Sequence, residues 1–139
     1  MTLIDTGPIV AFFDRDDRYH KMCVEILKET QPPLITTWPV VTECFYLLNF
    51  SWEVQDDLWT FIRRGGIEIY PLEKDHFNRC QDLMKQYRDL PMDLADATMV
   101  ALAEVLGLSK IFTLDHKDFS IYRLKQRKRF TLIPSGLTS

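Results

Sequence analysis

Four acidic residues stand out among the 20 acids of this 139-residue chain because of the elements in which they lie. Asp5 and Asp115 each follow a short β-rich run, so each is expected at the carboxyl end of a strand. Glu43 and Asp96 each lie in the first turns of a predicted helix. In an open parallel sheet, ligands bind beyond the carboxyl ends of the strands, so these four side chains are candidates for one shared site.

A divalent cation is the ligand that these residue types favour. No lysine or arginine lies close in sequence to Asp5 or Glu43, and both acids have apolar neighbours. A carboxylate in apolar surroundings is costly unless it is paired or bound to a metal. Hard cations such as Mg²⁺ take oxygen ligands, and carboxylates supply them. Glu43 carries most weight here, because it stands in Val-Val-Thr-Glu-Cys-Phe-Tyr with no capping role to explain it.

The other acids also have structural explanations, which the sequence alone leaves open. Asp93 is the expected N-cap of the helix that contains Asp96, and the helix dipole favours an acid at the position of Asp96. Asp5 precedes Thr-Gly-Pro and fits a turn, and Asp118 fits the cap of a segment that begins at Phe119. A structural role and a metal-binding role therefore compete for each of these residues.

Strands and helices alternate along the predicted chain. Pro32-Pro33 and Gly65-Gly66 each end one unit. Asp93 and Gly107 mark the start and the end of the clearest helix. This order predicts a parallel sheet that is covered by helices on both faces. The predicted strands are 3–4, 34–37, 67–70, 110–114 and 130–134, and the predicted helices are 19–29, 40–48, 52–63, 74–87 and 93–106.

The charge is unevenly distributed. The net charge of −3 excludes a globally basic protein such as a nucleic-acid packager. The segment 123–130 nevertheless carries five basic residues and no acid. A basic strip on an acidic body suits contact with a polyanion such as an RNA backbone, although a basic run taken alone is more often a solvated surface segment. The RNA-binding candidates are Arg123, Lys125, Arg127, Lys128 and Arg129.

Cysteine usage and hydropathy indicate a cytoplasmic protein without a membrane segment. Cys23, Cys44 and Cys80 are odd in number and lie in apolar helical patterns, so they are expected to be core thiols of a reducing compartment. The longest uncharged stretch has 13 residues and contains three prolines, which is too short to span a bilayer. An acid at position 5 and the lack of a basic start argue against a signal peptide.

Taken together, these residues resemble the PIN-domain family, and most closely its short ribonuclease toxins of the VapC type. The similarity runs from Leu3 to about Pro134, so residues 1–139 are expected to form a single PIN-like nuclease domain. The motifs that carry it are Leu-Ile-Asp5-Thr-Gly-Pro, Thr-Glu43 after a strand and Pro39, Asp93-Leu-Ala-Asp96-Ala at a helix start, and Thr113-Leu-Asp115 followed by Asp118-Phe.

The resemblance implies a fold, a metal site and a reaction. It implies an α/β domain with a five-stranded parallel sheet of order 3-2-1-4-5. It implies that Asp5, Glu43, Asp96 and Asp115 bind one or two Mg²⁺ or Mn²⁺ ions, supported by Asp93, Asp118, Thr6 and Thr113. A divalent-metal-dependent endoribonuclease of this kind is expected to leave 5′-phosphate and 3′-hydroxyl ends, with a pair of ions activating water and stabilising the leaving oxygen.

Partners and alternatives follow from the same resemblance. A VapC-type toxin is expected to be a homodimer and to be silenced by a small antitoxin. The many large apolar residues between Phe45 and Phe61 also favour contact with a second copy. Two alternatives stay open, an RNA-processing PIN nuclease that is not a toxin and a catalytically silent interaction module. A dehalogenase-like hydrolase with Asp5 as nucleophile is disfavoured, since it needs an acid where Gly7 stands.

Overall fold

A five-stranded parallel sheet forms the centre of the computed structural model, which describes residues 1–137. The strand order is β3-β2-β1-β4-β5, as predicted, and every neighbouring pair is parallel. In the central strand, Leu3 is in register with Ile35 on one side and with Ile111 on the other. The strands are β1 (Thr2–Ile4), β2 (Leu34–Thr36), β3 (Ile67–Ile69), β4 (Lys110–Phe112) and β5 (Thr131–Ile133).

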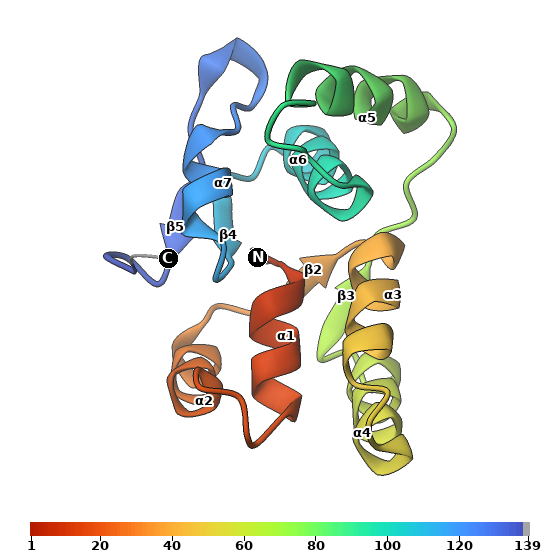
Figure 1. Ribbon diagram of the computed structural model, residues 1–139, viewed down its shortest axis with the longest axis vertical. Helices are drawn as coiled ribbons and strands as arrows, with labels where there is room; N and C mark the ends of the chain where they lie inside the picture. The colour runs from red at the N-terminus through yellow and green to blue at the C-terminus, as the bar shows by residue number, and fades with distance from the viewer. Residues whose placement is uncertain (138–139) are drawn as a thin grey trace.

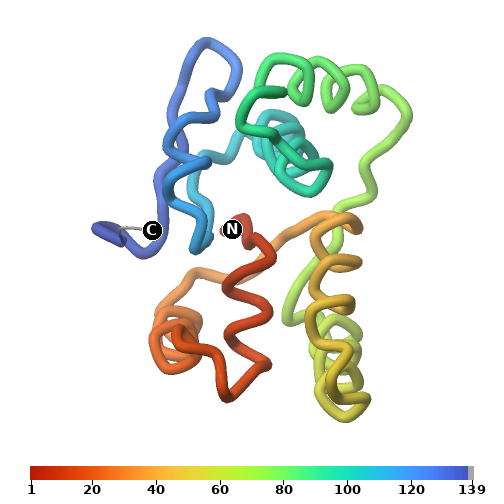
Figure 2. Tube along the Cα trace, viewed as in Figure 1, coloured from red at the N-terminus to blue at the C-terminus, as the bar shows by residue number. Residues whose placement is uncertain are grey.

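Helices cover both faces of the sheet, as predicted (Figure 1). The helices α1 and α2 lie on one side, and α5 and α6 lie on the other. The chain runs from β1 through β2 to β3 at one edge and then returns past β1 to β4 and β5 (Figure 2). The helices are α1 (Thr6–Phe13), α2 (His20–Glu29), α3 (Trp38–Leu47), α4 (Trp52–Arg63), α5 (Asp75–Gln86), α6 (Leu94–Leu106) and α7 (His116–Ile121), with a 3₁₀ turn at Lys125–Arg127.

The direction of the chain therefore reverses between β1 and β4. These two strands are neighbours, yet their connections leave toward opposite edges of the sheet. Such a switch point opens a crevice at the carboxyl ends of the strands, because the flanking loops diverge there. Asp5 directly follows β1, and Asp115 lies three residues after β4. The topology thus brings these two acids to the same crevice.

Two helices differ from the sequence analysis. Residues 5–8 were expected to close the first strand as a turn, but α1 begins at Thr6 and includes Gly7 and Pro8 in its first turn. Proline is tolerated there because the first N–H groups of a helix have no partner within it. The cap assigned to Asp118 is also wrong. Asp115 caps α7, and Asp118 lies at the third helical position and donates its N–H to the Asp115 carboxylate at 3.1 Å.

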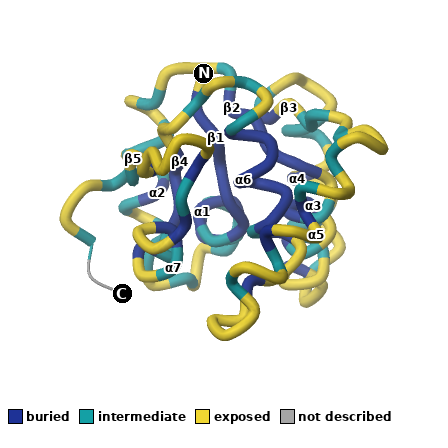
Figure 3. Tube along the Cα trace, turned by 90° about the horizontal axis from the view of Figure 1, so that it is seen from above, coloured by how far each residue is buried: buried dark blue, intermediate teal, exposed yellow. Residues whose placement is uncertain are grey.

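The core lies along the central strands and α6 (Figure 3). Leu3, Ile4, Ile111 and Phe112 are fully buried. Helix α6 is buried on nearly every side, from Ala95 to Ala103, which confirms the apolar pattern noted in its sequence. The three cysteines are buried free thiols, as predicted. None of the helices within residues 1–137 is long and apolar enough to cross a membrane.

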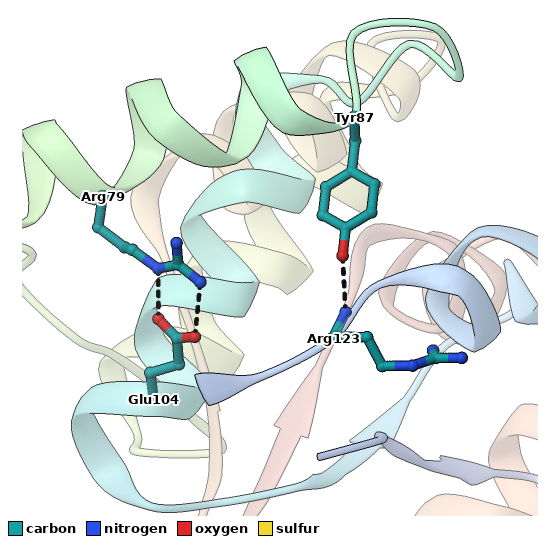
Figure 4. Close-up of polar contacts among 4 residues, drawn as sticks. All are labelled: Arg79, Tyr87, Glu104 and Arg123. Atoms are coloured by element: carbon teal, nitrogen blue, oxygen red, sulfur yellow. Dashed lines mark hydrogen bonds and ion pairs between the residues drawn. The ribbon is translucent and has the colours of Figure 1, made fainter. Parts of the chain in front are cut away.

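A partly buried ion pair joins α5 to α6 (Figure 4). The Arg79 guanidinium donates two hydrogen bonds to the Glu104 carboxylate, at 2.7 and 2.9 Å. The Glu104 side chain is only 3% exposed, and its hydrogen bonds raise the pKa of Arg79. At the end of α5, the Tyr87 hydroxyl accepts a hydrogen bond from the Arg123 N–H at 3.0 Å. These contacts fix α5 to α6 and to the segment that follows α7.

Candidate active site

An acidic pocket of about 500 Å³ lies at the carboxyl ends of β1 and β4. Every acid singled out in the sequence lines it, and no lysine or arginine does. Helix α3 contributes Glu43, which is half-buried on the pocket wall. The lining residues are Asp5, Thr6, Gly7, Glu43, Leu47, Pro91, Asp93, Asp96, Leu114, Asp115 and Asp118.

Three helices begin at this pocket. Asp5, Asp93 and Asp115 are the N-cap residues of α1, α6 and α7. The Asp93 carboxylate accepts the N–H of Asp96 at 2.8 Å, so the capping role expected for Asp93 is confirmed. The positive end of each helix dipole stabilises negative charge nearby. The backbone thus offsets part of the repulsion among the gathered carboxylates.

The tightest group of acids is Asp96, Asp115 and Asp118, whose candidate ligand atoms all lie within 4.8 Å of one another. The sequence analysis gave Asp118 only a supporting place. Asp118 reaches this group because α7 begins at His116, which places Asp118 in its first turn beside the cap. The helices α6 and α7 start in the same way, with an Asp at the N-cap and a second Asp three residues later. The two helix starts bring these side chains together.

Thr113 connects the deepest acid to this group. Its hydroxyl donates to Asp5 Oδ2 at 2.9 Å, and the same oxygen accepts the N–H of Asp115 at 3.0 Å. Thr113 is fully buried, and Asp5 is only 7% exposed. The hydroxyl proton must therefore point at Asp5, since Asp115 already supplies the other bond. Thr113 holds Asp5 and the start of α7 in a fixed relation.

Burial and mutual repulsion strongly perturb two of the acids. Burial, with smaller contributions from Glu43 and Asp115, raises the pKa of Asp5 to about 6, although hydrogen bonds from Thr6 and Thr113 work against the rise. Burial and then the charge of Asp5 raise the pKa of Asp96 to about 8. Burial also raises the pKa of Asp118, with Asp115 adding to it. Strongly shifted pKa values among acids that share a cleft are typical of functional sites.

One contact of the site was missed by sequence reasoning. The Tyr122 hydroxyl donates to Asp96 Oδ2 at 2.7 Å. Tyr122 follows α7 and is fully buried. No local pattern relates a residue at the end of one helix to an acid 26 positions earlier, so only the folded structure reveals this partner.

The residues present fit a hard divalent cation. Carboxylate oxygens from four separate segments face one pocket without a basic side chain among its lining residues. The Thr6 hydroxyl, also on the pocket wall, is buried without a hydrogen-bond partner among the described residues. A buried hydroxyl normally has a partner, and a cation with its water shell would provide one. Mg²⁺ keeps several waters when it binds carboxylates, so this donor set matches its preference.

A larger cavity of about 610 Å³ lies elsewhere, between the start of α3 and helices α5 and α6. Its lining is mostly apolar and includes the exposed side chains of Trp38, Phe77 and Leu94. Asp and Glu are absent from its lining residues. His76 and Cys80 also line it, but the carboxylate oxygens that suit a hard cation lie in the smaller, acidic pocket.

The basic segment does not present all of its charges to solvent. The Arg123 guanidinium donates to the carbonyl oxygens of Ser120, Ile121 and Tyr122, and so covers the end of α7. Beyond it, the chain turns back, with the Leu124 N–H bonded to the Lys128 carbonyl at 2.8 Å. Gln126 and Arg127 take left-handed backbone angles in this turn. The exposed basic residues are Lys125, Arg127, Lys128 and Arg129.

The raised pKa values predict how pH affects the metal-free protein. Asp5 and Asp96 hold protons in the folded state up to about pH 6 and about pH 8, whereas the ordinary pKa of an aspartate is 3.8. The folded state therefore binds more protons than the unfolded state between about pH 4 and pH 8, and the free energy of unfolding falls as pH rises. Thermal melting in EDTA should show the melting temperature decreasing across this range.

Asp96→Asn should flatten this decrease. Asparagine carries no charge and still accepts the Tyr122 hydrogen bond, at the cost of a helix-dipole contact of about 0.3–1 kcal/mol. At pH 8 in EDTA the variant should melt at or above the parent temperature, and it should lose most of the stabilisation that excess Mg²⁺ gives the parent. A variant that melts lower in EDTA and keeps the full Mg²⁺ shift would make Asp96 a helix-start residue only.

Comparison with known proteins finds a matching family and a curated relative. The family model described as the PIN domain matches residues 2–124. Ribonuclease VapC26 from Mycobacterium tuberculosis is 28% identical over 134 residues, which cover 95% of this chain and 99% of that protein.

Two solved structures share the fold. The crystal structure of VapC20 from Mycobacterium tuberculosis, a toxin that cleaves the sarcin-ricin loop, has a TM-score of 0.74 at 16% identity and covers 80% of this chain and 87% of that one. A toxin–antitoxin complex from Klebsiella pneumoniae has a TM-score of 0.67 at 20% identity and covers 86% of this chain and 91% of that one. With a family model matched over most of its length and the acidic pocket at the strand ends, this chain belongs to the PIN-domain family.

Proposed function

We propose that this protein is a divalent-metal-dependent endoribonuclease and that it acts as the toxin of a toxin–antitoxin pair. The observation that carries the proposal is the acidic pocket, in which carboxylates at the starts of α1, α6 and α7 and one from α3 converge without a basic residue. Its relatives support the assignment, since VapC26 is named a ribonuclease and VapC20 is described as a toxin that cleaves the sarcin-ricin loop.

In this proposal the pocket residues hold one or two Mg²⁺ or Mn²⁺ ions. Asp96, Asp115 and Asp118 are the oxygen donors that lie closest together, and Asp5 and Glu43 line the same pocket. The bound ions supply an activated water and neutralise charge on the scissile phosphate. Thr113 keeps Asp5 in place, and the unpartnered Thr6 hydroxyl is free to orient an oxygen of water or substrate. Asp5 and Asp96 release their protons when they bind a cation, so binding strengthens as pH rises.

RNA cleavage tests the proposal directly. Purified protein, free of any antitoxin, should cut a structured RNA in Mg²⁺ or Mn²⁺, leave 5′-phosphate ends, and stop when EDTA is added. Asp96→Asn should reduce cleavage to background, because the site loses a charged ligand. Asp56→Asn is a matched control, since Asp56 is an exposed acid of α4 outside the pocket. Cleavage that survives complete chelation would refute the metal mechanism.

The two alternative functions differ from the toxin in separate measurements. A catalytically silent module would bind RNA or protein without cutting RNA in the assay above. An RNA-processing nuclease would cut RNA but would not arrest growth when it is induced. For a toxin, induction should arrest growth, and a small protein encoded beside it should relieve the arrest. We place this activity in the cytoplasm, since three free buried thiols are typical of a reducing compartment.

We further propose that the exposed basic residues bind the RNA backbone. Lys125, Arg127, Lys128 and Arg129 lie on one exposed turn, whereas the Arg123 guanidinium is engaged with the end of α7. Backbone contacts of this kind give affinity without sequence choice. Arg123 is therefore a weaker candidate than the four residues that follow it.

The salt dependence of RNA binding measures these contacts. Replacing Arg127, Lys128 and Arg129 together by Gln should flatten the slope of log affinity against log salt by roughly 2–3. Replacing Lys21, Arg63 and Arg64 by Gln removes the same number of exposed charges from α2 and the end of α4 and should leave the slope unchanged. An equal effect of both triple variants would show that the turn acts through net charge only.

We also propose that the protein forms a homodimer. Part of the apolar sequence between Phe45 and Phe61 belongs to the core, since Leu48 and Leu58 are buried. The rest forms an exposed apolar patch around the connection between α3 and α4. This patch consists of Tyr46, Leu47, Phe50, Trp52 and Trp59, which are 38–71% exposed. Several large exposed apolar side chains on two connected helices are typical of a protein interface.

Sedimentation tests the dimer. The parent should sediment as a dimer at micromolar concentration, and Phe50→Ser with Trp52→Ser should yield a folded monomer. Trp38→Ser with Phe77→Ser is the comparison, because these exposed aromatics line the separate apolar cavity. A monomeric parent would contradict the dimer, and a monomer produced only by the second pair would move the interface to that cavity.

A further inference from the structure

Tyr122 connects the two helix starts that supply the tight acid group. Its hydroxyl donates to Asp96 Oδ2 at 2.7 Å, from α6, while its N–H donates to the Asp118 carbonyl at 3.1 Å, in α7. Asp96 and Asp118 are both members of the group whose ligand atoms lie within 4.8 Å. The two hydrogen bonds of Tyr122 therefore help to set how Asp96 and Asp118 lie relative to each other.

The Tyr122 ring has little freedom to move away. It is fully buried and packs edge-to-face against Tyr87, at 5.0 Å between ring centroids, and against Phe119, at 5.1 Å. Tyr87 is itself fixed by the hydrogen bond that its hydroxyl accepts from the Arg123 N–H (Figure 4). Phe119 packs in turn on Phe130. A hydroxyl on a ring held in this way keeps its direction toward Asp96.

We infer that Tyr122 is a positioning residue that keeps Asp96 Oδ2 engaged, so that Asp96 binds the metal through Oδ1 alone and the site favours Mg²⁺ or Mn²⁺ over Ca²⁺. A carboxylate bound to a metal carries no proton, so the phenol is the donor of this hydrogen bond. Bidentate binding would place both Asp96 oxygens on the ion. Ca²⁺ readily accepts bidentate carboxylates, whereas the smaller Mg²⁺ requires a near-octahedral set of single oxygens. The inference rests on the proposed metal site.

Metal affinities of Tyr122→Phe, measured by calorimetry without RNA, test the inference. The variant keeps the ring and removes only the hydroxyl. Mn²⁺ affinity should fall about 10–100-fold, as is typical when a partner of a metal ligand is removed. Ca²⁺ affinity should fall less, because both Asp96 oxygens become available, so the preference for Mn²⁺ over Ca²⁺ should narrow.

Tyr87→Phe is the matched control. It removes a hydroxyl from the neighbouring ring of the same aromatic cluster, but that hydroxyl contacts a backbone N–H rather than an acid. Because the ring and its packing on Tyr122 remain, it should lower both affinities far less than Tyr122→Phe does and should leave their ratio unchanged. If both variants weaken Mn²⁺ and Ca²⁺ equally, Tyr122 only supports the fold and the inference is overturned.

The outcomes separate this inference from the proposed function. If Tyr122→Phe binds both ions as the parent does, the inference fails while the metal site stands. If the parent binds no Mn²⁺, the metal site fails and the inference fails with it. Should Tyr122→Phe not fold, infrared difference spectra of the parent with and without Mn²⁺ decide, with Asp96→Asn identifying the band. A band splitting typical of monodentate carboxylate supports the inference, and one typical of bidentate carboxylate overturns it.

Discussion

Repulsion among carboxylates in one pocket is the constraint on which the rest of this structure depends. Asp5 and Asp96 have pKa values raised to about 6 and about 8, because burial weakens hydration and like charges lie close. A fold that simply placed these acids together would lose stability at neutral pH. The surrounding structure must therefore offset the repulsion without adding a basic side chain that would compete with a cation.

Backbone N–H groups and side-chain hydroxyl groups offset the repulsion among the carboxylates. Helices α1, α6 and α7 direct their N-termini at the pocket, and Asp93 and Asp115 each accept a backbone N–H. Thr113 donates to Asp5, and Tyr122 donates to Asp96. These donors are neutral, so they stabilise the carboxylates while the net charge of the pocket stays negative. The carboxylate oxygens are therefore already oriented before a cation binds. The hydroxyl donors also fix the directions of the side chains that accept from them, Thr113 that of Asp5 and Tyr122 that of Asp96.

Precision at the pocket depends on the packing of α6. This helix is buried from Ala95 to Ala103, and the Arg79–Glu104 pair fixes it to α5 near its other end. Close packing extends to α1, where a Cβ added to Gly7 would lie 3.2 Å from the Leu114 side chain. Both residues line the pocket. The small residue at position 7 thus lets the start of α1 approach the end of β4, which brings Asp5 near Asp115.

The sequence by itself determined the strand order, through resemblance, and the burial of α6, through its apolar pattern. It also selected every acid of the pocket, because strand ends and helix starts are local features that residue type and spacing reveal. Tertiary structure alone decided that Asp118 joins Asp96 and Asp115, that Arg123 covers the end of α7, and that Tyr122 holds Asp96. These contacts join α6 to α7 and to Tyr122, which are distant along the chain. Short-range preferences such as helix capping do not determine them, because the same caps are compatible with several packings of the helices. The exact starts of α1 and α7 were decided in the same way, since their first turns form where the sheet and neighbouring helices place them.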